Sequence, residues 1–268
     1  MSIFSSFILS PPSSIFISCM SVINIVGLSF FGISELFGQH LGYSKFWNVS
    51  IKKKKNEFTL SSRTGMLILY APAAVAAAAS FFLPGAVVGL RAQLVSLALA
   101  IHFFKRVFEV LFIHKYSGRM QLLSTIIISS SYTINTINII YTQHLSQSQS
   151  IREPAIDLKY PGILLSIIGI LGNFYHHLLL ANLRGKDEKG YKIPSGGLFG
   201  LVICPHYLFE IIVFFGLSLI AQTAYAFCFT AGTVVYLMGR SLATRRWYVS
   251  KFEDQFPREI KALVPFVF

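Results

Sequence analysis

The chain has 268 residues, of which 54% are hydrophobic and only 13% charged, and its formal net charge is +12. A soluble domain of this size would carry roughly twice that charged fraction, and the mean hydropathy of +0.61 also points to a lipid bilayer. The three cysteines, Cys19, Cys204 and Cys228, lack the spacing of zinc ligands, so we expect neither a metal site nor a disulfide framework.

Seven apolar stretches approach the length of about 20 residues that a helix needs to cross a bilayer. They lie near 13–34, 65–83, 88–113, 120–142, 162–183, 205–222 and 224–243. Residues 1–34 can also be read as a signal peptide, but the basic segment is missing and the apolar run is long, which favours a retained first span. The sequence therefore predicts an all-α, polytopic membrane bundle of about seven transmembrane helices, with residues 1–268 forming a single integral membrane domain.

The basic residues gather on one side of this expected bundle. With the N-terminus outside, most of the 23 lysines and arginines fall in inside segments, including the run at 52–55. The positive-inside rule then predicts a luminal N-terminus and a cytosolic C-terminus. This arrangement explains the net charge without a nucleic-acid partner, and for about half of these residues setting the topology and touching anionic lipid is a sufficient role.

Ionisable side chains within the spans mark candidate sites, because each costs on the order of 3 kcal/mol in the middle of a bilayer. The third span carries His102, Lys105, Arg106 and Glu109 on one helical face. Glu109 can pair with Lys105 or Arg106 within one turn. The stripe fits an ion-paired face near the interface or the wall of a water-filled cavity, and we favour the cavity.

The fifth span carries a second polar group of residues, Asn173, His176, His177 and Arg184. Adjacent histidines point in different directions on a helix, so we expect at most one of them in a site.

The start of the sixth span is a third candidate. Pro205 predicts that a helix begins directly after Cys204. His206 and Glu210 lie one turn apart, and backbone amides left free at the helix start would favour a developing oxyanion beside Tyr207. The glycine-rich and catalytic motifs of soluble nucleotide-binding enzymes and hydrolases are missing from the sequence, so a nucleotide would have to be held by the membrane fold and its loops.

The last hundred residues carry a series of short motifs. They occur at 172–173, 183–184, 191–194, 196–199, 204–207, 210–211, 240, 246–248, 251–254, 256–257 and 262–266. In this pattern the chain resembles the steroid 5-alpha-reductase family, which includes the very-long-chain enoyl-CoA reductases, and residues 115–268 resemble its C-terminal catalytic domain. A weaker similarity over 101–119 is to the enoyl-CoA reductases.

The resemblance implies a seven-helix enzyme of the endoplasmic reticulum membrane that uses NADPH to reduce a carbon–carbon double bond conjugated to a carbonyl in a lipid. The implied cofactor-binding residues are Asn173, His177, Arg184, Tyr191, Lys192, His206, Arg240, Arg246 and Tyr248. Arginines suit the phosphates of NADPH, although each can also be a topological anchor. His206 stands where the family usually has asparagine. Other enzymes of lipid synthesis are expected partners.

The residues on the substrate side differ from those of the steroid reductases. Tyr70 stands where those enzymes have a glutamate, and Phe103 where they have a tyrosine, whereas the lysine and tyrosine of the enoyl-CoA reductases are kept as Lys105 and Tyr207. The expected catalytic residues are Tyr207, Lys105, Tyr70 and Glu210. Tyr207 would donate to the carbonyl oxygen with support from Lys105, and Tyr207 or Tyr70 would deliver the proton.

Several functions remain open at this stage. The substrate can be a 3-oxo steroid or a trans-2-enoyl thioester, and a non-catalytic membrane protein such as a transporter is a rival from another class. Transporters often contain paired repeats with broken spans, and no second copy of the break at 204–210 is present. Membrane methyltransferases share a similar fold, but the arginine-rich end and the segment 191–194 favour a reductase.

Overall fold

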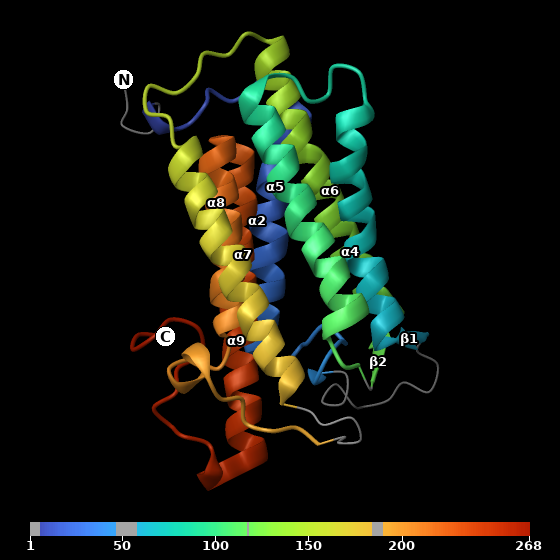
Figure 1. Ribbon diagram of the computed structural model, residues 1–268, viewed down its shortest axis with the longest axis vertical. Coiled ribbons are helices and arrows are strands. Elements are labelled where there is room, and N and C mark those ends of the chain that lie inside the picture. The colour runs from blue at the N-terminus through green and yellow to red at the C-terminus, as the bar shows by residue number, and fades with distance from the viewer. Residues whose placement is uncertain (1–5, 47–57, 117, 184–189) are drawn as a thin grey trace.

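The computed structural model describes residues 6–46, 58–116, 118–183 and 190–268. Within these ranges seven long helices run side by side along one axis (Figure 1). They are α2 (Ile15–Leu36), α4 (Ser62–Ala79), α5 (Gly89–Phe108), α6 (Leu122–Ser148), α7 (Lys159–Asn182), α8 (Pro205–Ala221) and α9 (Ala224–Phe252). Each overlaps one of the seven apolar stretches, so the expected all-α bundle is confirmed.

Short elements complete the described structure. A two-stranded antiparallel ribbon pairs β1 (Thr59–Ser61) with β2 (Arg119–Gln121), which precede α4 and α6 directly. A π-helix, η2 (Glu109–Ile113), continues α5. The three 3₁₀ segments are η1 (Ser80–Phe82), η3 (Gly197–Gly200) and η4 (Glu253–Gln255). The ribbon marks one end of the bundle, which we call the sheet end.

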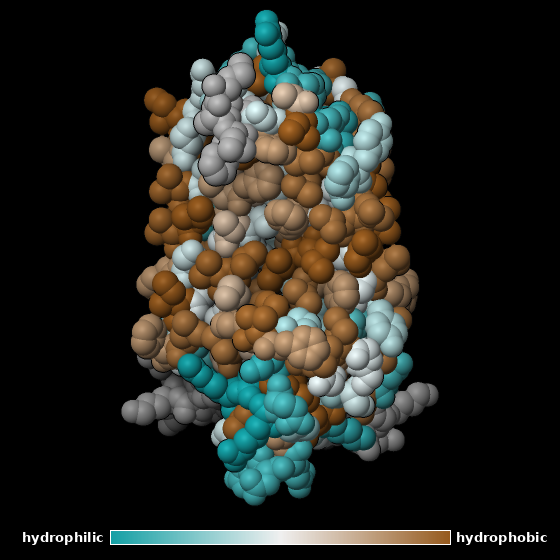
Figure 2. All heavy atoms as spheres, turned by 90° about the vertical axis from the view of Figure 1, so that its left-hand side faces the viewer, coloured by the Kyte–Doolittle hydropathy of each residue, from teal (hydrophilic) through white to brown (hydrophobic). Residues whose placement is uncertain are grey.

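The surface of the bundle matches a lipid environment. Five helical segments among the described residues are long and apolar enough to cross a membrane: Ile15–Leu36, Ser62–Phe82, Leu122–Ser148, Lys159–Asn182 and Ala224–Gln255. The helix α8 is apolar but shorter, and α5 is interrupted by charged side chains at both ends. Figure 2 shows a belt of hydrophobic side chains between two more hydrophilic ends. The chain is therefore a multi-pass membrane protein.

The helices pack in two groups. In one group α7 lies along α8 and α2 lies along α9, and in the other α4 packs against α5 and α6. Glycines bring α7 and α8 close together, because a Cβ atom at Gly169 would lie 2.6 Å from the Val213 nitrogen and one at Gly216 would lie 2.6 Å from the Ser166 nitrogen. Small residues allow this close approach in membranes, where the hydrophobic effect does not drive helices together.

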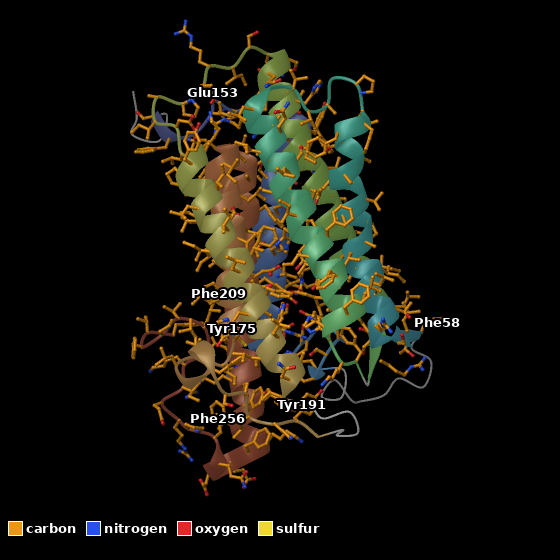
Figure 3. All side chains as sticks on the ribbon, in the orientation of Figure 1. Phe58, Glu153, Tyr175, Tyr191, Phe209 and Phe256 are labelled. Atoms are coloured by element: carbon orange, nitrogen blue, oxygen red, sulfur yellow. The ribbon has the colours of Figure 1, made fainter. Side chains whose placement is uncertain are left out.

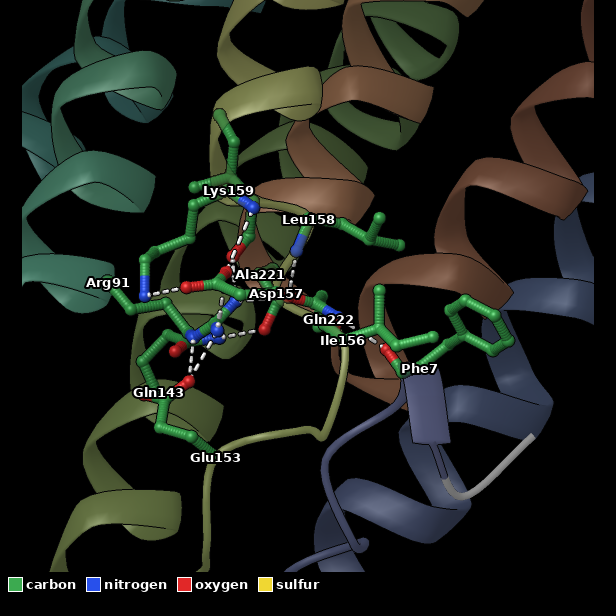
Figure 4. Close-up of polar contacts among 11 residues, drawn as sticks. Phe7, Arg91, Gln143, Glu153, Ile156, Asp157, Leu158, Lys159, Ala221 and Gln222 are labelled. Carbon is green, nitrogen blue, oxygen red and sulfur yellow. Dashed lines mark hydrogen bonds and ion pairs between the residues drawn. The ribbon is translucent and has the colours of Figure 1, made fainter. Parts of the chain in front are cut away.

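Arg91 ties the two groups together at the end away from the ribbon, as Figure 4 shows. Its guanidinium donates to Oε1 of Gln222 at 2.8 Å, and it forms ion pairs with Glu153 and Asp157. Although burial alone would raise the pKa of Asp157, hydrogen bonds from Lys159 and the charge of Arg91 hold it below its ordinary value. Paired charges therefore connect the two helix groups at this end.

Candidate active site

A cavity of about 580 Å³ lies between the two helix groups, toward the sheet end. Its volume falls within the range of roughly 300–1,000 Å³ that small-molecule sites occupy. Nine of the thirteen residues expected to be catalytic or cofactor-binding line it: Tyr70, Asn173, His177, Tyr191, Lys192, His206, Tyr207, Glu210 and Tyr248. Side chains from α4, α7, α8 and α9 and from the segment before η3 therefore meet around one space.

Three further expected residues, Lys105, Arg240 and Arg246, do not line the cavity. Lys105 lies just behind the wall, where its ammonium donates to Oδ1 of Asn173. Arg240 is only 1% exposed and is enclosed by protein. Arg246 is exposed and donates to the carbonyl oxygen of Leu36 at 2.9 Å. Arg184 lies outside the described residues.

The charged stripe of α5 forms a buried ion-pair network at the cavity wall. Glu109 is fully buried, and its carboxylate accepts a hydrogen bond from Nη1 of Arg106 at 2.5 Å and lies 3.1 Å from the Lys105 ammonium. Nη1 of Arg106 also lies 2.9 Å from Nδ1 of His177, and Nη2 donates to the Tyr70 hydroxyl. Glu109 therefore pairs with both cations that the helical spacing offered it, and Arg106 itself lines the cavity.

The helix type changes at Glu109. The chain widens into the π-helix η2 at this residue, and the amide of His114 closes the turn by donating to the Glu109 carbonyl oxygen at 2.8 Å. π-turns inside helices occur frequently at functional sites. Burial, followed by the charges of His177 and Arg106, lowers the pKa of His114 to about 3. His114 therefore adds no positive charge where it lines the cavity.

Glu109, His114 and His177 also have the spacing of a metal site, since one ligand atom from each lies within 4.8 Å of the others. However, Glu109 and His177 already contact the Arg106 guanidinium, and Lys105 approaches Glu109 from another side. A divalent cation here would lie beside two fixed positive charges, which raise its energy strongly at low dielectric. The electrostatics favour the ion-pair network, and the expected lack of a metal stays a prediction.

Asn173 links α5 to α8 through its amide group. Its nitrogen donates to the His206 carbonyl oxygen at 2.8 Å and to the Glu210 carboxylate at 3.0 Å, while its oxygen accepts from Lys105. The other carboxylate oxygen of Glu210 lies 3.4 Å from Nε2 of His102. The Asn173 amide is thus occupied by protein partners, and it orients the residues around it.

The helix α8 begins at Pro205, as the sequence predicts, and presents His206 and Tyr207 to the cavity. The expectation of free amides at this helix start is wrong for three groups. The amide of Cys204 donates to the Ala262 carbonyl oxygen, and those of Tyr207 and Leu208 donate to the Cys204 carbonyl oxygen. These three amides are therefore not available to negative charge in the cavity.

A buried cluster holds the loop that follows α2 against α9. The Glu35 carboxylate accepts a hydrogen bond from Nη1 of Arg240 at 2.6 Å and lies 2.5 Å from Nδ1 of His40. Arg240 also donates to the Tyr43 carbonyl oxygen at 3.1 Å and lies 4.1 Å above the Tyr43 ring. Tyr43 and Lys45 line the cavity, and sequence reasoning missed both because they follow the span rather than lie within it.

Aromatic rings and lysines collect at the sheet end of the cavity. The Tyr191 and Trp247 ring centroids are 4.8 Å apart, and the Lys45 ammonium lies 4.6 Å from the Tyr248 ring centroid. Figure 3 shows Tyr191 at this end of the molecule and Glu153 at the opposite end. The cavity thus joins this basic, aromatic region at the sheet end, which we call its mouth, to an apolar part lined by Met66, Leu69 and Ile128.

Comparisons with known proteins found a matching family model and several similar proteins. A family model described as 3-oxo-5-alpha-steroid 4-dehydrogenase matches residues 121–268. The steroid 5-alpha-reductase DET2 of Gossypium hirsutum is 40% identical over 107 residues, which cover 40% of this chain and 42% of that protein. A very-long-chain enoyl-CoA reductase of Dictyostelium discoideum is 32% identical over 169 residues, covering 63% of this chain and 55% of that protein.

The 3-oxo-5-alpha-steroid 4-dehydrogenase 1 of Rattus norvegicus is a further similar protein, 33% identical over 174 residues, which cover 62% of this chain and 64% of that protein. The chain spans about half the length of the curated relatives it matches.

Proposed function

Because this chain belongs to the 3-oxo-5-alpha-steroid 4-dehydrogenase family, we propose that it reduces a carbon–carbon double bond conjugated to a carbonyl in a lipid, with NADPH as the reductant. The observation that carries the proposal is a single cavity that joins a basic, aromatic mouth to an apolar interior with tyrosine side chains on its walls. Such a shape suits a polar nucleotide at one end and a hydrophobic substrate at the other.

Residues at the mouth fit a nicotinamide nucleotide. Nδ1 of His206 is buried, and no hydrogen-bond partner is recorded for it in the part of the chain that the structure describes. A carboxamide or ribose hydroxyl would satisfy this atom, while the Tyr191 and Tyr248 rings and Lys192 suit a nucleotide's bases and phosphates. When bound, NADPH supplies the hydride. We propose the same cofactor role for Arg184, which lies outside the described residues.

Tyr207 is our proposed donor to the carbonyl oxygen of the substrate. Its side chain lines the cavity beside His206, with ring centroids 4.3 Å apart. Hydride addition leaves negative charge on the carbonyl oxygen, which a preorganised hydroxyl in a dry site stabilises by several kcal/mol. Lys105 supports this arrangement through Asn173, which in turn holds the His206 carbonyl and Glu210.

The topology follows from the same proposal. All seven long helices would cross the membrane, with a luminal N-terminus and with the sheet end in the cytosol, where NADPH is available. Arg119 lies in the ribbon and Arg63 directly after it, and Lys192 follows Tyr191, which Figure 3 shows at this end; this distribution agrees with the positive-inside rule. We propose that residues 1–268 form one integral domain in the endoplasmic reticulum membrane, that 115–268 carry the catalytic part, and that other lipid-synthesis enzymes are partners.

The substrate class is tested by following NADPH oxidation by the purified protein in detergent. A progesterone-like 3-oxo steroid and trans-2-hexadecenoyl-CoA are compared side by side, since relatives named for both reactions match this chain. We expect oxidation with at least one of them. A faster reaction with the thioester would favour the enoyl-CoA alternative. Lys105 and Tyr207, which are the residue types of the enoyl-CoA reductases, support this alternative. Lack of oxidation with both would favour a non-catalytic membrane protein.

Glu35→Gln is expected to raise the KM for NADPH by about tenfold and to change kcat much less. Glu35 would act as a positioning residue, because its ion pair with Arg240 holds the loop that carries Tyr43 and Lys45. Hydrogen bonds to charged groups contribute roughly 1.5–3 kcal/mol, and 1.4 kcal/mol corresponds to a factor of ten in affinity. Steady-state kinetics at varied NADPH measure both constants.

Glu253→Gln is the matched control for this prediction, since Glu253 is an exposed carboxylate at the end of α9. An unchanged KM for NADPH in Glu35→Gln would show that the Arg240 cluster has no part in cofactor binding.

A further inference from the structure

Tyr70 carries a phenol oxygen that is held by a fixed positive charge at the cavity wall. The side chain is 5% exposed and lines the cavity from α4. Nη2 of Arg106 donates to its oxygen, and the guanidinium carbon lies 4.5 Å from the ring centroid. Because the oxygen accepts from Arg106, the hydroxyl hydrogen must point elsewhere, and no acceptor for it is recorded across 6–46, 58–116, 118–183 and 190–268. This hydrogen is available to a ligand in the cavity.

Arg106 cannot easily turn away from Tyr70. Its other terminal nitrogen, Nη1, is 2.5 Å from the Glu109 carboxylate and 2.9 Å from Nδ1 of His177. Glu109 in turn comes from the π-helix and is fully buried. The two terminal nitrogens of the guanidinium therefore have different partners: Nη1 is held by Glu109 and His177, and Nη2 donates to the Tyr70 hydroxyl. A charge fixed in this way needs no reorganisation when negative charge develops beside it.

We propose that Tyr70 is the acid that protonates the α-carbon of the substrate, and that Arg106 is a positioning residue that stabilises the phenolate left behind. This inference rests on the proposed function. Hydride adds to the β-carbon, and the electron pair of the former double bond is shared between the α-carbon and the carbonyl oxygen. The Tyr70 O–H bond then breaks, a C–H bond forms at the α-carbon, and the O–H electron pair remains on the phenolate oxygen. Water from the cavity mouth returns the proton.

The two tyrosines then have separate tasks. Tyr207, on α8, has no cation hydrogen-bonded to its hydroxyl group among the described side chains, so it is suited to hold the carbonyl oxygen without giving up its proton. Tyr70, on α4, has Arg106 bound to its oxygen, so the phenolate left after proton loss would face a positive charge. Proton transfer by a positioned side chain typically contributes 10²–10⁴-fold to a rate.

The test uses the full-length protein and isotope effects with whichever substrate it reduces. Tyr70→Phe is expected to lower kcat about 10²-fold and to leave equilibrium binding of NADPH, followed by its fluorescence, unchanged. Because protonation becomes the slow step, the solvent deuterium isotope effect on kcat should rise. The primary isotope effect on kcat, measured with NADPH that carries deuterium at the transferred position, should fall toward one. Tyr141→Phe, the same change on a lipid-facing position of α6, is the control.

Arg106 variants keep the inference open to refutation if Tyr70→Phe fails to bind NADPH. Arg106→Gln should lower kcat and raise the solvent isotope effect on it. Arg106→Lys keeps the charge and should therefore have a higher kcat than Arg106→Gln. A purely structural role for Arg106 would lower protein yield and NADPH binding without shifting the slow step. Wild-type kcat and isotope effects in Tyr70→Phe, or in both Arg106 variants, would overturn the assignment. Wild-type protein that oxidises no NADPH would instead overturn the proposed function beneath it.

Discussion

Tyr207→Phe is expected to lower kcat by about 10²–10³-fold, the usual loss when one donor to a developing oxyanion is removed. The phenylalanine ring keeps the contact with His206, whose centroid is 4.3 Å from that of Tyr207, so the start of α8 should keep its shape. Equilibrium binding of NADPH should therefore stay as in the wild type. The measurements are kcat at saturating concentrations of both substrates and the dissociation constant for NADPH.

Two features of the site make this loss large. The backbone amides of Cys204, Tyr207 and Leu208 are occupied by carbonyl groups, so they cannot replace the hydroxyl as donors. The cavity also lies between the two helix groups, whose side chains occupy part of the space from which water could solvate the oxyanion.

Tyr175→Phe is the matched control for Tyr207→Phe. Tyr175 lies on α7, close to the sheet end in Figure 3, but its side chain is 49% exposed on the lipid-facing surface. Wild-type activity is expected for this variant. Full activity in Tyr207→Phe as well would remove Tyr207 from the reaction and leave the carbonyl oxygen without its proposed donor.

The helices could be predicted because the bilayer restricts the choice. A spanning segment must satisfy its backbone hydrogen bonds internally, so an apolar stretch of sufficient length becomes a helix whatever its neighbours are. Pairing within a helix is equally local. The spacing of Lys105, Arg106 and Glu109 fixes their common face, and the structure contains both ion pairs that this spacing allows.

Contacts between distant segments could not be predicted in the same way. The sequence motif at Arg240 indicates an important position, and the resemblance implied a contact with the cofactor. In the structure the Arg240 guanidinium is enclosed by Glu35 and Tyr43, which are about 200 positions away in the chain. Only tertiary packing decides which partner an arginine meets, and a motif holds no information on that partner.

The π-turn at Glu109 could not be predicted from the sequence either. Regular α-helical spacing from Lys105 and Arg106 already places Glu109 on their face, so a pattern-based prediction had no reason to change helix type there. The amide of His114 bonds to the Glu109 carbonyl oxygen and closes the wider turn, and this contact depends on where the chain leaves the bundle.

Glu109→Leu is expected to reduce the free energy of unfolding by roughly 3–5 kcal/mol, because removing one partner of a buried ion pair leaves an uncompensated charge. Here two cations lose their partner, since the carboxylate is 2.5 Å from Nη1 of Arg106 and 3.1 Å from the Lys105 ammonium. Leucine has a similar volume, so the loss reports charge rather than a packing defect. Helical circular dichroism during titration with a denaturing detergent measures it.

Glu153→Gln is the matched control, because it removes an exposed carboxylate that is paired with an arginine, whereas Glu109→Leu removes a buried one. Glu153 is also bound by an arginine, but its side chain is 61% exposed, and exposed ion pairs contribute only about 0–1 kcal/mol. Its partner Arg91 keeps Gln222 and Asp157 after the substitution, whereas Arg106 loses its only recorded carboxylate among the described residues. Equal stability of Glu109→Leu and Glu153→Gln would mean that the α5 network does not hold the cavity wall. Arg106 would then have no fixed position from which to act on Tyr70.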